Sequence, residues 1–231
     1  MDSLSLIIPA HNSAKVIEDS LYQYYDIFSK KFKKLEIIVV CNGCSDETEN
    51  ICISLKKKIP LKVISIQKRG KGYALTAGFN EAQYNLMGFL DADNPFDLNK
   101  ISDMIDYLNE NDVVIVSKYL RGKKRKQDYL LRRLVSLGGF VFSRIIFDMN
   151  FRDTQAGAKF FKKEVWPEIN KKNKFVCNGF DWDIEFLYKA KKNKFKIADV
   201  YIPVNSEKFS TFKLKYLPGM VKRLVILRFL K

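Results

Sequence analysis

The sequence has little histidine, few cysteines and no long apolar run, and each shortage excludes a class of protein. One histidine and four cysteines in 231 residues do not make a disulfide scaffold, so we expect a reducing compartment. A membrane span needs roughly 18 uninterrupted apolar residues, and the best candidate, 134–147, is interrupted by Ser136, two glycines and Arg144. Met1-Asp2-Ser3 has no basic region, so we do not expect a secretory signal.

Acidic residues are scarce relative to basic ones. Forty-one Lys and Arg against 26 Asp and Glu leave a formal net charge of +15 at pH 7. Such a charge predicts a negatively charged partner, which could be nucleic acid, anionic lipid headgroups or a phosphorylated substrate. Because 47% of the residues are hydrophobic, the chain has enough apolar material for a core.

The first half of the chain alternates regularly between strand and helix patterns. Short apolar runs predict buried strands, and the segments between them have the spacing of amphipathic helices. This order predicts an α/β fold with a mostly parallel sheet flanked by helices. The predicted strands are 4–8, 35–40, 61–66, 86–90, 113–116 and 196–204, and helices are predicted at 73–82 and 181–192. Since no repeat or low-complexity linker is found, we predict a single domain, 1–231.

Asp91 and Asp93 follow a predicted strand, at the sheet edge where ligands bind in such folds. Two carboxylates two residues apart on a strand point the same way and repel each other unless a cation lies between them. Mg²⁺ or Mn²⁺ suits this place, because hard divalent ions bind carboxylates together with phosphate oxygens. The alternative is a turn that caps the next helix, since Asn94-Pro95 favours a turn.

The loop Lys68-Arg69-Gly70-Lys71-Gly72 combines three cations with two glycines before a predicted helix. Glycine permits a close backbone approach, and the helix N-terminus adds donors suited to phosphate. The loop matches neither the P-loop GxxxxGK[ST] nor a dinucleotide fingerprint. The alternative is a solvated basic turn.

The second half of the chain differs in composition. Residues 118–133 hold eight basic residues and one acid, and a strongly apolar segment follows up to 147. The C-terminal segment 213–231 repeats the combination, with an apolar stripe among basic residues. This favours contact with a phosphate-bearing amphiphile or an anionic membrane surface. The alternatives are a solvated basic face and a helix packed on the core.

Asp183 and Glu185 lie in the predicted helix 181–192. Positions i and i+2 do not share a helix face, so at most one of the two is expected to face a site. The alternative is a helix N-terminus enriched in acids that suit its dipole.

These segments resemble the family 2 glycosyltransferases of the GT-A fold, and within them the dolichyl-phosphate glucose and mannose synthases, the glucosyl branch above all. The resemblance rests on residues 5–12, 36–40, 42–48, 69–74 and 91–93, and on the more specific later segments 152–159 and 182–188. It implies an inverting transfer of a hexose from UDP-glucose or GDP-mannose to a polyprenyl (dolichyl) phosphate.

The resemblance also implies roles for individual residues. Mg²⁺ or Mn²⁺ would be bound by Asp91 and Asp93, and the candidate catalytic residues are Asp93, Arg132, Asp183 and Glu185. The nucleotide sugar would contact Pro9, Ala10, Asn12, Asn42, Arg69, Lys71, Asp91, Ala92 and Asp93. The acceptor phosphate would contact Lys118, Arg132, Ser136 and Lys213. Residues 1–117 would bind the nucleotide sugar, and 118–231 would bind the acceptor and the membrane interface.

Three positions depart from the family pattern. Ser13 stands where the family usually has an acid, and Cys41-Asn42 replaces an Asp pair, so the nucleotide base stays open. Lys118 stands where an arginine is expected, which keeps the charge but loses a bidentate fork.

The type of acceptor decides which chemistry is needed. An acceptor phosphate is already an anionic nucleophile, and the metal ion and the basic loop would neutralise the charge that develops on the departing nucleoside diphosphate. A glycan or other hydroxyl acceptor would need a base, for which Asp183 or Glu185 is available.

Two expectations concern location and other partners. A nucleic-acid-binding protein is suggested only by the charge, and no zinc-finger or RNA-recognition motif supports it, so we do not expect nucleic acid as a partner. We expect a cytoplasmic protein, peripherally attached to the cytoplasmic face of a membrane.

Overall fold

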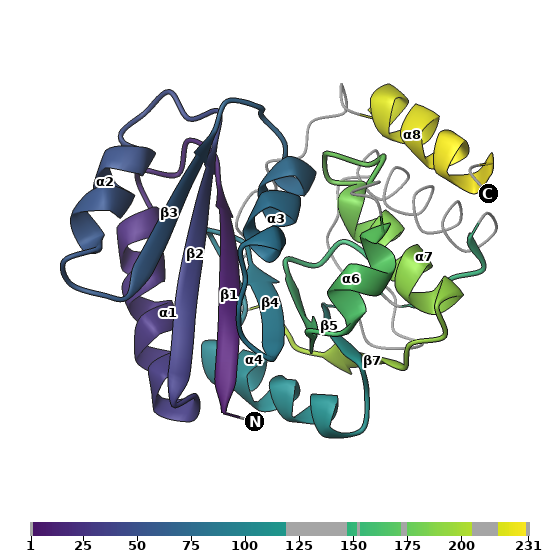
Figure 1. Cartoon of the computed structure of the whole chain (residues 1–231), viewed down its shortest axis with the longest axis horizontal. Helices are drawn as coiled ribbons and strands as arrows, with labels where there is room; N and C mark the ends of the chain where they lie inside the picture. Colours follow the sequence, from purple (N-terminus) through teal and green to yellow (C-terminus); the bar gives the residue numbers. More distant parts are fainter. Residues whose placement is uncertain (1, 119–146, 152, 172–174, 205–216, 230–231) are drawn as a thin grey trace.

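The sheet at the centre of the molecule lies between two layers of helices (Figure 1). The computed structural model describes residues 2–118, 147–151, 153–171, 175–204 and 217–229. Its seven strands have the order β3-β2-β1-β4-β6-β5-β7, and β6 alone among them runs antiparallel to its neighbours. The predicted α/β fold with a mostly parallel sheet is therefore confirmed.

The described elements follow the predicted alternation in the first half of the chain. The strands are β1 (Ser3–Ala10), β2 (Lys34–Asn42), β3 (Leu61–Ile66), β4 (Leu86–Leu90), β5 (Val113–Ser117), β6 (Ala158–Lys162) and β7 (Ile197–Tyr201). The helices are α1 (Ile17–Lys31), α2 (Thr48–Leu55), α3 (Lys71–Asn80), α4 (Leu98–Met104), the 3-10 helix η1 (Ile105–Asn109), α6 (Val165–Ile169), α7 (Trp182–Lys192) and α8 (Leu217–Phe229).

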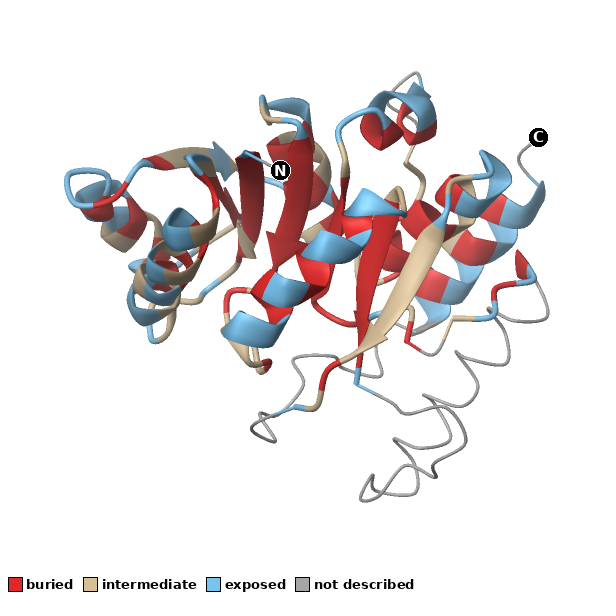
Figure 2. Cartoon of the chain, turned by 90° about the horizontal axis from the view of Figure 1, so that it is seen from below, coloured by how far each residue is buried: buried red, intermediate tan, exposed pale blue. Residues whose placement is uncertain are grey.

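Both faces of the sheet are covered, so the inner strands are apolar without interruption. Leu6 and Val39 pack with α1, α2, α4 and η1, whereas their neighbours Ile7 and Val40 pack with α3, α6 and α7. This division follows from the alternation of side chains along a strand. Figure 2 shows buried strands at the centre and helices that expose only their outer sides.

Strand β6 was not predicted. It enters the sheet between β4 and β5 and places Phe160 opposite Gly88. The ring of Phe160 fills the space beside this glycine, where an added Cβ would come within 2.1 Å of Phe160 Cδ1. The predicted strand 196–204 is also shorter, since β7 ends at Tyr201. The prediction missed β6 because Lys159 interrupts its short apolar run.

Several predictions fall outside the described residues. The basic segment 118–133 and the apolar segment 134–147 lie there except for Lys118 and Phe147. No helix in the described part of the chain is long and apolar enough to cross a membrane. The assignment of the whole chain to one domain stays a prediction.

Candidate active site

The side chain of Asn42 joins the loops that follow β1, β2 and β3. It is buried, its Nδ2 donates to Ala10 O (2.8 Å), and its Oδ1 accepts from Gly70 N (3.1 Å). The carbonyl oxygen of Asn42 is 2.9 Å from His11 Nδ1. Asn42 therefore holds the edge of the sheet together. Its contact with a nucleotide base stays a prediction, as do those of Pro9 and Ala10 at the end of β1.

Asn12 lies at the outer rim of the same edge. It is exposed, and its Oδ1 accepts from Ser45 N (2.8 Å), so it joins the loops after β1 and β2 from outside. Its backbone has a positive φ of 49°, a conformation that asparagine tolerates better than most residues.

The two glycines of the basic loop permit a close approach, as the sequence indicated, but their neighbour is protein backbone. Gly72 N donates to Asn178 O (3.0 Å), and a Cβ at Gly72 would lie 2.7 Å from Asn178 Cα. Gly70 has a φ of 148°, where a Cβ would lie 2.4 Å from Asn178 O. The glycines thus fasten the start of α3 to the segment before α7. Arg69 is exposed beside them.

Lys71 turns inward and joins two carboxylates. Its Nζ lies 2.8 Å from Asp91 Oδ1 and 3.4 Å from Asp183 Oδ2. The other oxygen of Asp183 pairs with the buried Lys159, whose Nζ also donates to Ala156 O (2.9 Å). We call this row of alternating charges, Asp91–Lys71–Asp183–Lys159, the charge network. It brings together residues from α3, α7, β6 and the end of β4.

Burial and pairing act in opposite directions on the two lysines. Burial would lower the pKa of Lys71, but the carboxylates of Asp183 and Asp91 outweigh it and raise the pKa. For Lys159, burial is stronger than the attraction of Asp183, and the charge of Lys71 adds to it, so the pKa is lowered. Both ammonium groups lie over the ring of Phe89, at 4.7 and 5.3 Å from its centroid.

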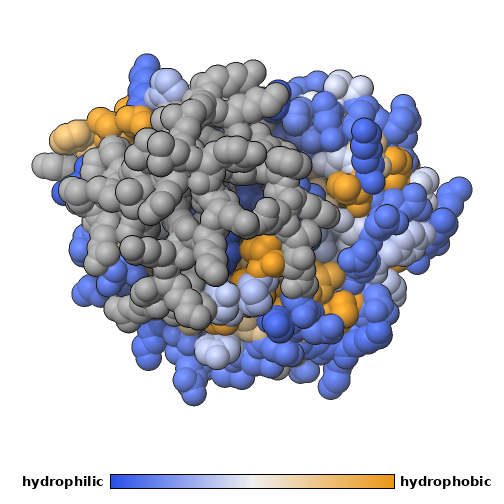
Figure 3. Space-filling view, turned by 180° about the vertical axis from the view of Figure 1, so that it is seen from behind, coloured by the Kyte–Doolittle hydropathy of each residue, from blue (hydrophilic) through white to orange (hydrophobic). Residues whose placement is uncertain are grey.

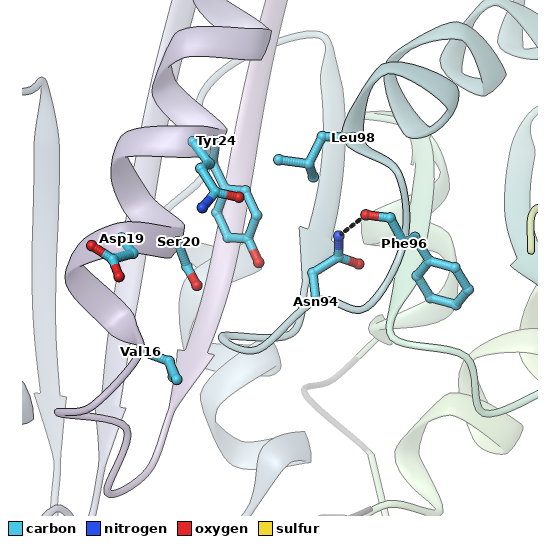
Figure 4. A pocket seen from close by; sticks show the side chains of 8 residues that line it. Val16, Asp19, Ser20, Tyr24, Asn94, Phe96 and Leu98 are labelled. Atoms are coloured by element: carbon cyan, nitrogen blue, oxygen red, sulfur yellow. Dashed lines mark hydrogen bonds between the residues drawn. The ribbon is translucent and has the colours of Figure 1, made fainter. Parts of the chain in front are cut away.

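The turn that carries Asp91 and Asp93 is held through its backbone. Asp91 N donates to Gly157 O (3.0 Å), and Asp91 O accepts from Asn94 N (3.2 Å) and from the hydroxyl of Tyr24 (2.7 Å). Figure 4 shows Tyr24 on α1 and Asn94 on the facing segment, with the phenol directed toward the turn. Burial, reinforced by the charges of Asp91 and Asp93, raises the pKa of Tyr24.

The described residues fit a divalent ion only with the help of a substrate. They contain no group of three or more His, Cys, Asp or Glu side chains arranged around a common point. Asp91 is engaged by Lys71, and its Oδ2 packs so closely on Gly157 that a Cβ there would lie at 2.1 Å. Asp93 is half-buried two residues further on, beyond the buried Ala92. Magnesium commonly binds one or two carboxylates together with substrate phosphates, and this donor set matches that pattern.

The two acids of α7 have separate surroundings. Asp183 belongs to the charge network, whereas the buried Glu185 accepts from Val176 N and Cys177 N (2.9 and 2.7 Å) and pairs with Lys189 Nζ (2.8 Å). Which of the two faces a substrate stays a prediction. A catalytic role for Asp183 or Glu185 stays a prediction, and Glu185 holds the backbone before α7.

Of the predicted acceptor-phosphate residues, Lys118 is described. It follows β5, and its Nζ lies 4.0 Å from Asp153 Oδ2, a carboxylate that is 8% exposed. Arg132, Ser136 and Lys213 lie outside the described residues. The whole acceptor side of the site, with the role of Lys118, therefore stays a prediction.

Sequence reasoning missed Lys159 and Tyr24 as parts of the site. Lys159 is a buried lysine within the apolar strand β6, a combination that is rare unless the charge is paired. That signal was available in the residues Ala158–Lys162, but it does not tell which acid is the partner. The phenol of Tyr24 carries no signal, because tyrosine is ordinary on the buried face of a helix.

Comparison with known proteins agrees with this fold. A family model described as "Glycosyl transferase family 2" matches residues 5–180. The chain is 27% identical to a dolichyl-phosphate beta-glucosyltransferase of Dictyostelium discoideum, over 98% of this chain and 74% of that protein. It is 30% identical to a dolichol-phosphate mannosyltransferase of Pyrococcus furiosus, over 83% of this chain and 54% of the relative.

Among solved structures, the chain is similar to glucosyl-3-phosphoglycerate synthase from Mycobacterium tuberculosis in complex with Mn²⁺, uridine diphosphate and phosphoglyceric acid. The TM-score is 0.73 at 19% identity, over all of this chain and 80% of the other. A likeness at this identity shows the fold, which is that of the GT-A glycosyltransferases. With the family match over most of its length, the chain belongs to glycosyl transferase family 2.

Proposed function

We propose that the protein is a metal-dependent, inverting hexosyltransferase that acts on a polyprenyl phosphate such as dolichyl phosphate. The observation that carries the proposal is the charge network beside Asp93, at the carboxyl edge of a family 2 fold. Support comes from relatives named for transfer to dolichyl phosphate that match more than nine-tenths of the chain. The proposed donor is UDP-glucose or GDP-mannose, and the choice of these two sugars is supported by glucosyl and mannosyl relatives that both match.

The donor side of the reaction uses the first half of the chain. Asp93, with Asp91 beside it, would hold Mg²⁺ or Mn²⁺ together with the diphosphate of the donor. When bound, the ion supplies positive charge that stabilises the departing nucleoside diphosphate. Lys68 and Arg69 are exposed at the same edge and add positive charge there.

The acceptor side needs a nucleophile but no proton acceptor. An oxygen of the lipid phosphate attacks the anomeric carbon, a new carbon–oxygen bond forms, and the bond to the nucleoside diphosphate breaks with its electron pair. In-line displacement inverts the anomeric carbon, so an α-linked donor gives a β-linked lipid phosphate sugar. Lys118, and the predicted residues Arg132, Ser136 and Lys213, would bind the acceptor phosphate.

The surroundings of the two acids on α7 favour an acceptor that arrives ionised. Both oxygens of Asp183 contact lysine ammonium groups, so taking a proton would weaken two ion pairs. Glu185 is engaged by two backbone amides and Lys189. Taking a proton from a hydroxyl acceptor would therefore weaken existing contacts of either side chain.

An anionic membrane surface is part of the proposal. Helix α8 buries Met220, Leu224 and Leu227, but Val221, Val225 and Ile226 are 38–41% exposed and Phe229 is 80% exposed. We call these four residues the outer face of α8, and Figure 3 shows hydrophobic atoms gathered where the helix lies. Lys222 and Arg228 are exposed on the same side of the helix, and the net charge of +15 is complementary to an anionic leaflet. The protein would then act peripherally at the cytoplasmic face of a membrane.

The direct test offers radiolabelled UDP-glucose and GDP-mannose, each with one polyprenyl phosphate and with a polyprenol. We expect transfer from one donor to the phosphate and none to the polyprenol. Equal transfer to a hydroxyl acceptor, independent of lipid phosphate, would favour the alternative. Vesicles with and without phosphatidylserine test the membrane part, where we expect sedimentation with the anionic vesicles only.

Removal of the ion or of its carboxylate tests the metal part. We expect Asp93→Asn to lower kcat by about 10²–10³-fold, the usual effect of removing one group that stabilises developing charge. Excess EDTA should abolish transfer, and added Mn²⁺ should restore it. Asp103→Asn, an exposed acid on α4, is the matched control and should keep full activity. Full activity of Asp93→Asn, or in excess EDTA, would overturn this part.

A further inference from the structure

Helix α8 is fastened to the start of α7 by a two-point ion pair. Arg223 Nε donates to Asp181 Oδ2 (2.6 Å), and its Nη2 donates to Asp181 Oδ1 (3.2 Å). The side chain of Asp181 is fully buried. Gly179 and Gly219 flank the guanidinium, since a Cβ at either would lie 3.4 Å from one of its Nη atoms. A paired fork of this kind fixes orientation as well as distance.

Asp181 ends a short segment where several parts of the site meet, residues 176–181, which we call the junction segment. Its first amides, Val176 N and Cys177 N, donate to Glu185. Its middle contacts the donor loop, because Asn178 O accepts from Gly72 N (3.0 Å). The carbonyl of Phe180 accepts from Gln155 Nε2 (3.3 Å) in the turn before β6. Asp183 of the charge network follows two residues later.

The same helix therefore has two functional sides. One side carries Arg223 and the buried Met220, Leu224 and Leu227, and it faces the protein. The other is the outer face, which is apolar and exposed. Because one helix carries both sides, binding of the outer face also holds the Arg223 side chain in place for its pairing with Asp181.

We propose that Arg223 is a positioning residue through which membrane binding by α8 orders the junction segment, and with it the donor loop and Asp183. The proposal rests on the proposed function, because it assigns the outer face of α8 to a lipid surface. On a membrane the helix is held and the fork is formed, so the Gly70–Gly72 loop is aligned against Asn178. Away from the membrane, α8 moves more freely and the junction segment is ordered for less of the time. A lipid surface thus raises the rate of sugar transfer by increasing the fraction of molecules with an ordered junction segment, without contact between the lipid surface and either substrate.

The test compares transfer to geranyl phosphate with and without phosphatidylcholine–phosphatidylserine vesicles. The variants are Arg223→Gln, which removes the fork, and Arg223→Lys, which keeps the charge but cannot bind in two places. Lys100→Gln, on the exposed surface of α4 and away from α8 (Figure 1), is the matched control for loss of charge. Sedimentation measures vesicle binding, and hydrogen exchange follows the amides of Val176, Cys177 and Gly179.

We expect vesicles to stimulate the wild type and Lys100→Gln by about tenfold, within the usual range of coupling between two sites. Arg223→Gln should sediment with vesicles as well as Lys100→Gln does but lose most of the stimulation, with Arg223→Lys between them. Vesicle binding should slow exchange at the three amides in the wild type and not in Arg223→Gln. A general loss of folding would instead lower vesicle-free activity and vesicle binding together.

Two results would overturn the inference. One is equal stimulation of Arg223→Gln and Lys100→Gln, and the other is exchange at the junction segment that does not respond to vesicles in the wild type. Failure of the proposed function has a different signature, because wild-type protein would then transfer no sugar to any polyprenyl phosphate. The exchange measurement would still show whether vesicle binding orders the junction segment.

Discussion

The two sides of the functional edge are held together by different kinds of contact. On the side of β1–β3, the contacts are hydrogen bonds between neutral groups. The amide of Asn42 joins two loops, and the backbone of Gly72 is bound to Asn178. On the side of β6, α7 and α8, buried acids pair with basic residues. The pairs are Asp183 with Lys159, Glu185 with Lys189, and Asp181 with Arg223.

The difference predicts how each side responds to damage. A neutral hydrogen bond contributes about 1 kcal/mol to stability, and more is lost when a buried partner is left unsatisfied. Removing one member of a buried ion pair leaves an uncompensated charge, which costs about 3–5 kcal/mol. Single substitutions on the side of β6, α7 and α8 should therefore lower stability more than those on the side of β1–β3.

The largest effect is expected for Lys159→Met. The variant leaves Asp183 buried with Lys71 as its remaining lysine partner, so the free energy of unfolding should fall by about 3 kcal/mol or more. Urea unfolding measures the change. Lys162→Met on the same strand is the control, because Lys162 is 30% exposed at 3.4 Å from Asp112, and its loss should cost less than about 1 kcal/mol. Similar losses for the two variants would remove the contrast between the sides.

A smaller effect is expected for Asn42→Ala on the donor side. It leaves Ala10 O and Gly70 N without their amide partner, so stability should fall by about 1–3 kcal/mol. Because two loops at the donor edge lose their connection, the KM for the nucleotide sugar should rise more than kcat falls. Asn50→Ala, on an exposed side chain of α2, is the control. An unchanged KM would show that the donor edge does not need this amide.

Tyr24→Phe should have a still smaller effect. It removes one of two donors to Asp91 O and leaves the ring in place, so about 1 kcal/mol should be lost. We expect about fivefold weaker binding of Mn²⁺ with UDP, which calorimetry measures directly. Tyr25→Phe, half-buried on the same helix, should bind as the wild type does. Equal binding by both variants would mean that the phenol does not position the turn.

The smallest effect is expected from pH at the outer donor loops. Burial would raise the pKa of Asp46, but hydrogen bonds from Thr48 and from Ala14 N outweigh it and lower the pKa. Its contribution to stability is therefore present above the unfolded value and is lost as pH falls through the folded one. Asp46→Asn should flatten the decline of stability between about pH 5 and pH 2. A variant that declines as steeply as the wild type and Asp103→Asn would contradict this.

The residues at the carboxyl edge of β1–β4 were found from the sequence because local patterns carry them. Apolar runs end at Ala10, Asn42 and Leu90, and the polar or glycine residues just beyond them form the edge. The sequence was a poorer guide to the contacts that those residues make. Asn42 and Lys71 were predicted to bind the nucleotide sugar, and their described contacts are with protein groups.

The periodicity of the chain is enough to define an α/β fold, the edge of the sheet at which ligands are expected, and the two aspartates beside it, because strand burial and loop composition are local properties. The place of β6, the pairing of Lys159 with Asp183, and the fork between Arg223 and Asp181 each join segments far apart in the chain. Such contacts depend on which surfaces meet after packing, and a buried charge is stable only where its partner is brought to it. For that reason the partners of the buried lysines and of Arg223 emerge only from the folded molecule.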